Sequence, residues 1–344
     1  STAVPRFELR QDELMDRFGG LFPDLGAQAE ARMLPVFENA GIDPRHSCVP
    51  IEWYEQPHGW AEKNKLFVEN AVDLLEVAAW RALEKAGLAI TDMDAIVSVS
   101  TTGIATPSLD ALLMERMGAR RDVERLPIFG LGCAGGVIGL ARAATMAQAR
   151  PGRKVLLVVV ELCALTFRRA DQSKSNQVAT ALFGDGAAAA VITNDGPGPV
   201  ITASGEHTWA GSLDIMGWSV EDDGLGVIFS RDIPSLTRSA FRDAALEFLQ
   251  ANGLSLAEVD EFVCHPGGAK VLDALEEAFG LVPGGLHIPR QVLRRYGNMS
   301  AVTVLFVLDA VLEAERGGRY LLSSLGPGFT AAYLTMETIT QAGS

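Results

Sequence analysis

The sequence has few cysteines and few histidines, and this scarcity argues against two kinds of site. Its 344 residues include five histidines and four cysteines, and the cysteines, Cys48, Cys133, Cys163 and Cys264, lie far apart. No CxxC pair occurs, and no histidine lies at the spacing of a zinc ligand. We therefore expect neither a disulfide framework nor a metal site, and a reducing, cytoplasmic setting fits this pattern best.

Positive charge and long apolar runs are also scarce. Lysine and arginine total 29 against 43 aspartates and glutamates, which gives a formal net charge of -14. Phosphate backbones are bound by clustered lysines and arginines, so nucleic acid is not an expected partner. The most apolar run, VLLVVV at 155–160, has the length of a strand, and the first 20 residues are charged throughout. Neither segment predicts a membrane span or a signal peptide.

A repeat runs through the chain at an offset of 166 residues. Segment 79–99 aligns with 245–265, pairing Gly87 with Gly253, and segment 149–159 aligns with 315–325. Each copy reads as an amphipathic helix, a glycine turn, an apolar strand, a helix, and then a buried helix before a second apolar strand. Strands that alternate with helices predict an α/β fold of two duplicated halves with mixed, mostly parallel sheets, and we divide the halves at 1–210 and 211–344.

The repeat brings three polar residues to comparable places. Cys133 lies among glycines in FGLGCAGG, where the buried helix of the first half begins, and Asn298 lies at the matching point of the second half. His265 closes the first strand of the second half. Sites in α/β proteins lie at such strand ends and helix starts. A helix N-terminus and a nearby histidine would favour a thiolate, so we predict a Cys133 pKa below the usual value of roughly 8.5.

Other interpretations fit parts of the same pattern. Gly130, Gly132 and Gly135 satisfy the dinucleotide fingerprint G-x-G-x-x-G, although the next acidic residue, Glu161, comes later than that fingerprint expects. The order Cys, His, Asn also occurs in papain-like proteases, but their cysteine lies near the N-terminus in a different motif. The third alternative is a binding protein that keeps the fold but has lost catalytic activity. These readings remain open on the residues alone.

Five segments in order resemble a known family. They are GCAGG around Cys133, FGDGAAAA (183–190), HPGGAKVLDALEEAFGL (265–281), YGNMSAVTVLFVLD (296–309) and LGPGFT (325–330). Together they resemble the type III polyketide synthases of the chalcone and stilbene synthase superfamily, from about residue 50 to the end. Ketoacyl-ACP synthases of the third type are the related alternative, but they carry His-Gln-Ala-Asn where this chain has His-Pro-Gly-Gly. The resemblance implies a thiolase fold, a layered αβαβα arrangement and a homodimer.

Within that family, TTGIATPSLDA (101–111) and ELCALTF (161–167) are most similar to bacterial alkylpyrone and alkylresorcinol synthases, which extend fatty acyl starters. The resemblance implies acyl-CoA and malonyl-CoA as substrates and no cofactor, and it leaves open delivery of the starter by an acyl carrier protein. It assigns Cys133 as the nucleophile that holds the acyl chain. It assigns His265 and Asn298 to the enolate formed when malonyl-CoA loses carbon dioxide.

The resemblance also assigns a substrate pocket. Phe183 matches a gatekeeping aromatic residue, and Thr106 matches a residue that reaches into the cavity of a neighbouring subunit. The remaining substrate-binding positions are Thr101, Cys163, Thr166, Val227, Gly268, Lys270 and Pro327.

Two positions in this pocket depart from the plant enzymes. Val227 falls where they have a second gatekeeping phenylalanine, which predicts a wider opening, although a shift of two would place Phe229 there. The basic cluster for CoA phosphates is reduced to Arg45, which predicts a larger role for Lys270 and Arg231.

Overall fold

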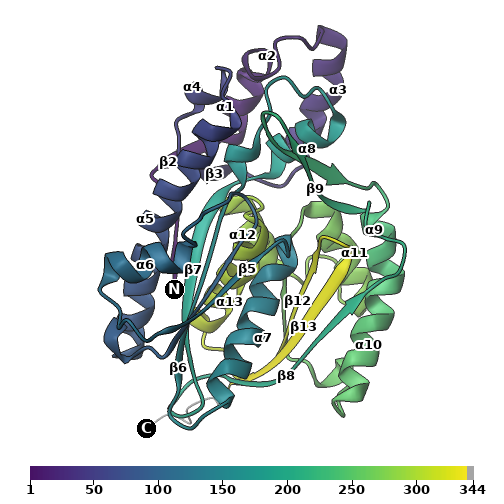
Figure 1. Ribbon diagram of the computed structural model, residues 1–344. Helices are drawn as coiled ribbons and strands as arrows, with labels where there is room; N and C mark the ends of the chain where they lie inside the picture. Colours follow the sequence, from purple (N-terminus) through teal and green to yellow (C-terminus); the bar gives the residue numbers. More distant parts are fainter. Residues whose placement is uncertain (339–344) are drawn as a thin grey trace.

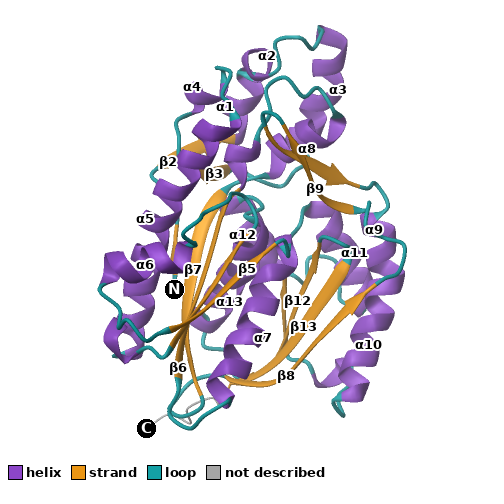
Figure 2. Cartoon of the chain, viewed as in Figure 1, coloured by secondary structure: helices purple, strands orange, loops and turns teal. Residues whose placement is uncertain are grey.

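Two stacked β-sheets with helices between them and on both outer faces form the core of the protein (Figure 1 and Figure 2). The structure is a computed structural model and describes residues 1–338. The first sheet and its outer helices come from the N-terminal half of the chain, and the second sheet comes from the C-terminal half.

The first sheet has five strands in the order β1-β7-β6-β4-β5. Strand β4 is parallel to both of its neighbours, β5 and β6, whereas β7 is antiparallel to β6 and to β1. Every residue of β4 is buried, as are the apolar residues of β6, because helices cover both faces of the sheet. The strands are β1 (Thr2–Ala3), β4 (Ala95–Ser100), β5 (Glu124–Phe129), β6 (Lys154–Leu162) and β7 (Asp185–Thr193).

The second sheet has four strands in the order β11-β12-β13-β8. Here β11 is parallel to β12, while β13 is antiparallel to β12 and to β8. The strands are β8 (Val200–Thr208), β11 (Glu261–Cys264), β12 (Gly318–Gly326) and β13 (Thr330–Thr338).

The two sheets confirm the predicted duplication. Strands β4, β6, β7 and β1 of the first sheet correspond in order and direction to β11, β12, β13 and β8 of the second. The predicted division at residue 210 does not follow this pairing, since β8 hydrogen-bonds to β13 of the second sheet. The sheet pairing places the boundary between Thr193 and Val200.

Helices form three layers around the sheets, as a thiolase fold requires. Helices α7 (Gly135–Gln148) and α13 (Thr303–Glu313) lie between the sheets (Figure 1). Their apolar side chains form one buried cluster with residues of both sheets. Helices α5 (Trp60–Ala86) and α6 (Leu109–Met117) cover the outer face of the first sheet, and α10 (Arg242–Ala251) and α11 (Ala269–Phe279) cover that of the second.

Two small antiparallel pairs and several short helices complete the fold. The pairs are β2 (Phe7–Arg10) with β3 (Pro44–Ser47), and β9 (Met216–Glu221) with β10 (Gly224–Phe229). The remaining α-helices are α1 (Gln11–Asp16), α2 (Phe18–Leu21), α3 (Ala27–Glu38), α4 (Ile51–Tyr54), α8 (Lys174–Leu182), α9 (Ile233–Leu236) and α12 (His287–Tyr296). The short turns are η1 (Ile90–Asp92), η2 (Gly132–Ala134), η3 (Cys163–Thr166), the π-helix η4 (Thr237–Phe241), η5 (Leu256–Glu258) and η6 (Ser300–Val302).

The four cysteines all lie within residues 1–338, and all are free thiols. Across that same range, no helix is both long and apolar enough to cross a membrane. Nor does any group of three or more His, Cys, Asp or Glu side chains in the described chain have an arrangement that could hold a metal ion.

Candidate active site

Cys133 lies in η2, the short turn between β5 and α7. The glycines around it allow the two halves of the chain to meet at this point. Gly132 has a φ of +47°, and a Cβ atom there would lie 2.5 Å from the Pro327 ring. A Cβ atom on Gly136 would lie 2.2 Å from the carbonyl oxygen of Ala301. No larger residue fits at either position without displacing the second half, which explains why the cysteine is surrounded by glycine.

A buried threonine and a buried glutamate hold the turn from the other side. The Gly132 amide donates to Thr101 Oγ1 at 3.0 Å, and the Thr101 amide donates to Glu161 Oε2 at 2.9 Å. Thr102 Oγ1 donates to the same carboxylate oxygen at 2.8 Å. Burial raises the pKa of Glu161 to about 7, although these hydrogen bonds act in the opposite direction. Glu161 could not be placed here from the sequence, because it lies on β6 whereas the groups that donate to it follow the end of β4.

His265 follows β11, and its backbone amide donates to the Ser323 carbonyl of β12 at 2.9 Å. The side chain is buried, and neither ring nitrogen has a hydrogen-bond partner within the described residues. An added Cβ on Gly267 would lie 3.7 Å from Nε2, so the ring is directed along the loop that follows β11. A buried imidazole without a protein partner is available to bond a ligand.

Asn298 lies beside this loop, in the turn before η6. Its Nδ2 donates to the Gly267 carbonyl at 3.1 Å, and its Oδ1 accepts from the Ser300 amide at 2.8 Å. An amide nitrogen carries two hydrogens, so one donor remains after these two bonds. The Asn298 backbone also pairs with Phe183 in an isolated β-bridge. The fold therefore joins the predicted asparagine directly to the predicted gatekeeping aromatic.

The segments carrying the three residues are in contact. The turn with Cys133 packs against Pro327, which follows β12, and against η6, which follows Asn298. Strand β12 in turn holds the backbone of His265. The predicted grouping of Cys133, His265 and Asn298 therefore rests on contacts between the two halves.

The predicted low pKa of Cys133 is wrong for this structure. The residue as a whole is partly exposed, yet burial of the thiol raises its pKa to about 12, and a hydrogen bond with Ser300 offsets this only in part. Burial also lowers the pKa of His265 to about 4. Among the described residues, no hydrogen bond joins the Cys133 and His265 side chains. Burial therefore disfavours the charged form of each side chain, and neither gains an opposite charge that would offset this effect. The resting pair is a neutral thiol and a neutral imidazole.

This charge state predicts how Cys133 reacts with iodoacetamide. At any pH below its pKa, a thiol is ionised only in small part, and this thiolate fraction grows about tenfold for each pH unit. We expect the alkylation rate at Cys133, followed by peptide mass spectrometry, to rise steadily from pH 6 to pH 9. A rate that is already at its plateau at pH 6 would instead show a thiolate–imidazolium pair.

Four of the predicted pocket residues share one cavity. Cys163, Thr166, Phe183 and Val227 line a space of about 30 Å³, which is room for one or two water molecules. The other walls are mainly apolar and include Leu9, Leu14 and Leu21 from the N-terminal segment, whereas Arg45, Asn176 and Thr180 are polar members of the lining. Thr101 is not part of this lining in the described structure, and instead supports the Cys133 turn.

Two aromatic side chains of the β9–β10 hairpin pack against Phe183 near Val227. Val227 and Phe229 lie on one face of β10, and the Phe229 ring meets Phe183 edge-on with centroids 5.8 Å apart. Trp218, which pairs with Val227 across the hairpin, meets Phe183 at 6.1 Å. This packing fits the alternative alignment that places Phe229 at the second aromatic position, because strand periodicity brings Phe229 to the same face as Val227 and the hairpin adds the Trp218 indole. The width of the opening stays a prediction. The EDDG turn at 221–224 was the sequence signal for that register.

Comparison with known proteins places this site in a family. The N-terminal domain model of chalcone and stilbene synthases matches residues 55–197, and the C-terminal domain model matches residues 206–340. The chain belongs to the chalcone and stilbene synthase family. It is a type III polyketide synthase, an acyltransferase that condenses malonyl-CoA units.

Individual relatives agree with this assignment over nearly the whole chain. A putative chalcone synthase of Bacillus subtilis is 36% identical, with 97% of this chain and 96% of that protein covered. A 1,3,6,8-tetrahydroxynaphthalene synthase of Streptomyces peucetius is 37% identical, with coverages of 98% and 91%. The crystal structure of 1,3,6,8-tetrahydroxynaphthalene synthase from Streptomyces coelicolor, a bacterial type III polyketide synthase, has a TM-score of 0.93 at 30% identity and coverages of 99% and 98%.

The dinucleotide and protease interpretations are wrong for this synthase. Two of the three glycines of the apparent fingerprint, Gly132 and Gly135, are packed against Pro327 and Ala301, which occupy the space that a pyrophosphate would need. Glu161, the acidic residue considered for a ribose, is fully buried against Thr101 and Thr102.

The residues considered for CoA phosphates divide into two groups. Arg45 is only 1% exposed, and its Nη1 donates to the Thr180 carbonyl at 2.6 Å, so it does not reach a surface phosphate. Its predicted role is wrong, because β3 directs the side chain inward. Lys270, at the start of α11, and Arg231, just after β10, are both exposed.

The last two substrate-binding candidates differ in exposure. Gly268 is buried at the start of α11, close to Leu182. Thr106 is exposed on the loop after β4, away from this cavity.

Proposed function

We propose that this synthase condenses an acyl-CoA starter with malonyl-CoA through Cys133, His265 and Asn298. The observation that supports the proposal is the contact between the segments that carry these residues, which come from both halves of the chain and lie beside a mainly apolar cavity. Cys133 is the nucleophile, and the other two residues present hydrogen-bond donors where oxygen gains negative charge.

The first chemical step loads the starter. Cys133 Sγ attacks the thioester carbon, and its proton passes to His265. As the S–C bond to CoA breaks, His265 gives this proton to the leaving sulfur, so CoA is released as a thiol. Because the resting imidazole is neutral, it has a free nitrogen to accept this proton. The products are an acyl thioester on Cys133 and free CoA.

The second step makes the carbon nucleophile without a base. Malonyl-CoA loses carbon dioxide, and the electrons of the broken bond form an enolate whose oxygen accepts hydrogen bonds. The remaining Nδ2 hydrogen of Asn298 and the ring N–H of His265 are the donors, and both groups are buried, which strengthens their effect. The enolate carbon then attacks the acyl thioester and releases the Cys133 thiolate, so one round lengthens the chain by two carbons.

We propose a fatty acyl starter and an alkylpyrone or alkylresorcinol product. The aliphatic lining by Leu9, Leu14 and Leu21 supports an alkyl chain over a polar one, since each buried methylene contributes roughly 0.8 kcal/mol. The resting cavity of about 30 Å³ is too small for such a chain. A long starter therefore has to displace these leucines or the β9–β10 hairpin as it enters.

A small starter is the second candidate, and the cavity size favours it. The tetrahydroxynaphthalene named for two of the relatives has no alkyl chain. If the cavity keeps its resting volume, this synthase would make a product of that kind from short acyl units. The two candidates differ in whether an alkyl tail enters the space beside Cys163.

Products formed from malonyl-CoA and a ladder of acyl-CoA starters, identified by mass spectrometry, distinguish them. We expect alkylpyrones or alkylresorcinols from the longer starters, and Cys163→Phe should move the optimum to shorter chains because a phenyl ring fills the cavity. Cys163→Ser is the matched control and should keep the wild-type profile. Preference of the unmodified protein for malonyl or acetyl units alone would contradict the fatty starter, and no product from any starter would contradict the whole proposal.

We also propose that the synthase is a homodimer that binds through the edge of its first sheet. Strand β5 has no partner on its outer side among the described residues, and Phe129 at its end is 59% exposed. Ile104, on the loop that carries Thr106, is 54% exposed. An unpaired edge with exposed apolar residues favours pairing with a second copy. Sedimentation equilibrium of the wild type should give the dimer mass, and a monomer at micromolar concentration would refute this arrangement.

A further inference from the structure

The β9–β10 hairpin supplies Trp218, Val227 and Phe229, which together with Phe183 we call the gate. The hairpin belongs to neither large sheet. Its two strands pair only with each other in the described structure. Its inner face presents Trp218, Val227 and Phe229 to Phe183. An isolated two-stranded hairpin is only marginally stable in water, so contacts outside the pair must hold its position.

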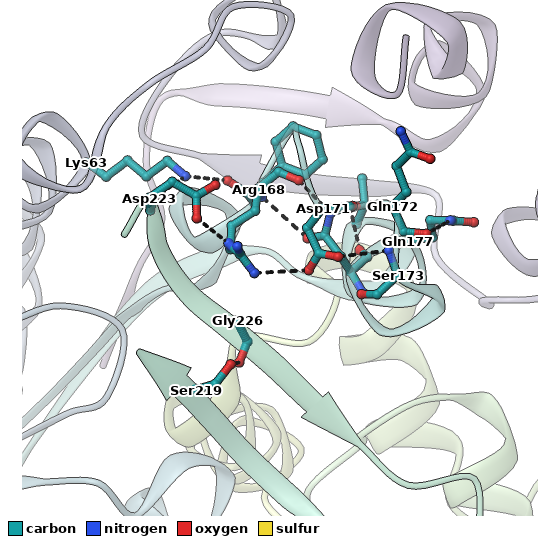
Figure 3. A network of polar contacts seen from close by, with 12 residues as sticks. Lys63, Arg168, Asp171, Gln172, Ser173, Gln177, Ser219, Asp223 and Gly226 are labelled. Carbon is teal, nitrogen blue, oxygen red and sulfur yellow. Dashed lines mark hydrogen bonds and ion pairs between the residues drawn. The ribbon is translucent and has the colours of Figure 1, made fainter. Parts of the chain in front are cut away.

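An arginine from the N-terminal half binds the tip of this hairpin. Arg168 Nε donates to the Asp223 carboxylate at 2.5 Å, and its Nη1 donates to Asp171 at 3.2 Å (Figure 3). Arg168 is 17% exposed and Asp223 33% exposed at their side chains. Partial burial and a guanidinium shared by two carboxylates make this contact stronger than a typical surface ion pair.

A buried lysine binds the same tip from helix α5. Lys63 Nζ donates to the Asp223 carbonyl at 3.0 Å and to the Phe167 carbonyl at 2.7 Å. Lys63 is buried, and burial lowers its pKa to about 8 while the charge of Asp223 acts against the shift. The tip is thus attached through its backbone by Lys63 and through its side chain by Arg168 (Figure 3).

The same arginine is tied to the helix that ends at Phe183. Asn176 of α8 donates from Nδ2 to the Arg168 carbonyl at 2.8 Å and to the Asp171 carbonyl at 2.7 Å. Helix α8 then runs to Leu182, directly before Phe183. Arg168 therefore links the two elements that supply the aromatic gate, the hairpin on one side and α8 on the other.

Gly226 shows that the hairpin is shaped to receive this arginine. A Cβ atom at Gly226 would lie 3.0 Å from Arg168 Nη1 and 2.5 Å from Ser219 Oγ. The Ser219 hydroxyl donates to the Gly226 carbonyl at 3.3 Å across the two strands. Any larger residue at 226 would push the guanidinium away from the strand.

We propose that Arg168, Asp223 and Lys63 form a latch that positions the gate and so sets which acyl groups the synthase admits. None of the three is a catalytic residue, since none of them lies among the residues around Cys133. Holding the hairpin against Phe183 keeps the cavity small and excludes oversized acyl groups. The selectivity part of this inference rests on the proposed function, while the positional part does not.

Hydrogen–deuterium exchange of the purified protein tests the positional part directly. In Arg168→Met we expect amide exchange in residues 216–229 to rise by about tenfold, since a loss of roughly 1.4 kcal/mol in a local opening equilibrium corresponds to that factor. Gly226→Ala should give a similar rise from the hairpin side. Arg142→Met is the matched control. It removes the ion pair between Arg142 of α7 and Glu206 of β8, which lies outside the hairpin, so exchange in residues 216–229 should not change.

Starter competition tests the selectivity part. The ratio of kcat/KM between a branched or oversized starter and the preferred one should rise by about tenfold in Arg168→Met, while malonyl-CoA decarboxylation without a starter stays within about twofold of the wild type. Arg168→Lys should restore part of both effects, since a lysine can still pair with one carboxylate.

The outcomes separate the two proposals. Unchanged exchange in 216–229 overturns the latch whatever the enzyme makes. Increased exchange with an unchanged starter ratio overturns its role in selectivity, and absence of any condensation product in the wild type overturns the proposed function alone.

Discussion

Cys133→Ala should abolish acyl loading and reduce product formation by at least about 10³-fold, because the other thiol near the cavity, Cys163, is only 1% exposed and is not positioned by the Cys133 turn. Malonyl-CoA decarboxylation should continue in this variant at a measurable rate, since the enolate is stabilised by Asn298 and His265. Intact-protein mass spectrometry after incubation with an acyl-CoA measures loading, and release of labelled carbon dioxide measures decarboxylation.

Cys48→Ala is the appropriate control for this experiment. Cys48 is buried, and its backbone amide, which the substitution leaves in place, donates to Asp185 at 2.9 Å. We expect this variant to load acyl groups as the wild type does. Acyl transfer in Cys133→Ala, or loss of loading in Cys48→Ala alone, would move the nucleophile to another residue.

Asn298→Ala should lower the rate of malonyl-CoA decarboxylation by about 100-fold or more, the scale seen when one oxyanion donor is removed. The substitution deletes the free Nδ2 hydrogen and also the acceptor that holds the Ser300 amide. Acyl loading should persist, because Cys133 and His265 remain. The measurements are the same carbon dioxide release and the same mass of the acylated protein.

Asn298→Asp separates the lost donor from a disturbed backbone. Aspartate keeps an oxygen for the Ser300 amide but has no N–H, and its charge opposes a second negative oxygen nearby. We expect decarboxylation to fail in Asn298→Asp as well. Recovery of the rate in that variant would show that Asn298 serves only to hold the turn.

The duplicated architecture could be derived from the sequence because each copy keeps its own local pattern. The 166-residue offset, the glycine turns and the alternation of helix with apolar strand are short-range features. They predicted that β4 and β11 are equivalent strands and that α7 and α13 are buried helices, without any knowledge of long-range contacts. The placement of these helices between two sheets was implied only by the family resemblance. The boundary near residue 210 could not be derived in this way, since β8 belongs to the second half only through its pairing with β13.

The surroundings of the substrate pocket likewise depend on long-range contacts that the sequence did not reveal. Cys163, Thr166, Phe183 and Val227 line one cavity, but the sequence did not show that Trp218 and Phe229 pack against Phe183. Those contacts depend on the register of a hairpin and on how it packs against α8. Arg45 carried the charge expected of a phosphate ligand, yet its side chain lies inside the protein.

Residue types and their spacing by themselves determined the fold class, the order of the elements and the three polar residues of the candidate site, because these follow from local periodicity and from motifs with few alternatives. Tertiary structure alone decided the charge state of that site, the size of the cavity and the latch at Asp223. Burial shifts the pKa values of Cys133 and His265 by an amount that depends on every atom packed around them. The position of the gate depends likewise on Lys63, Arg168 and Asp223, which meet only after the chain has folded.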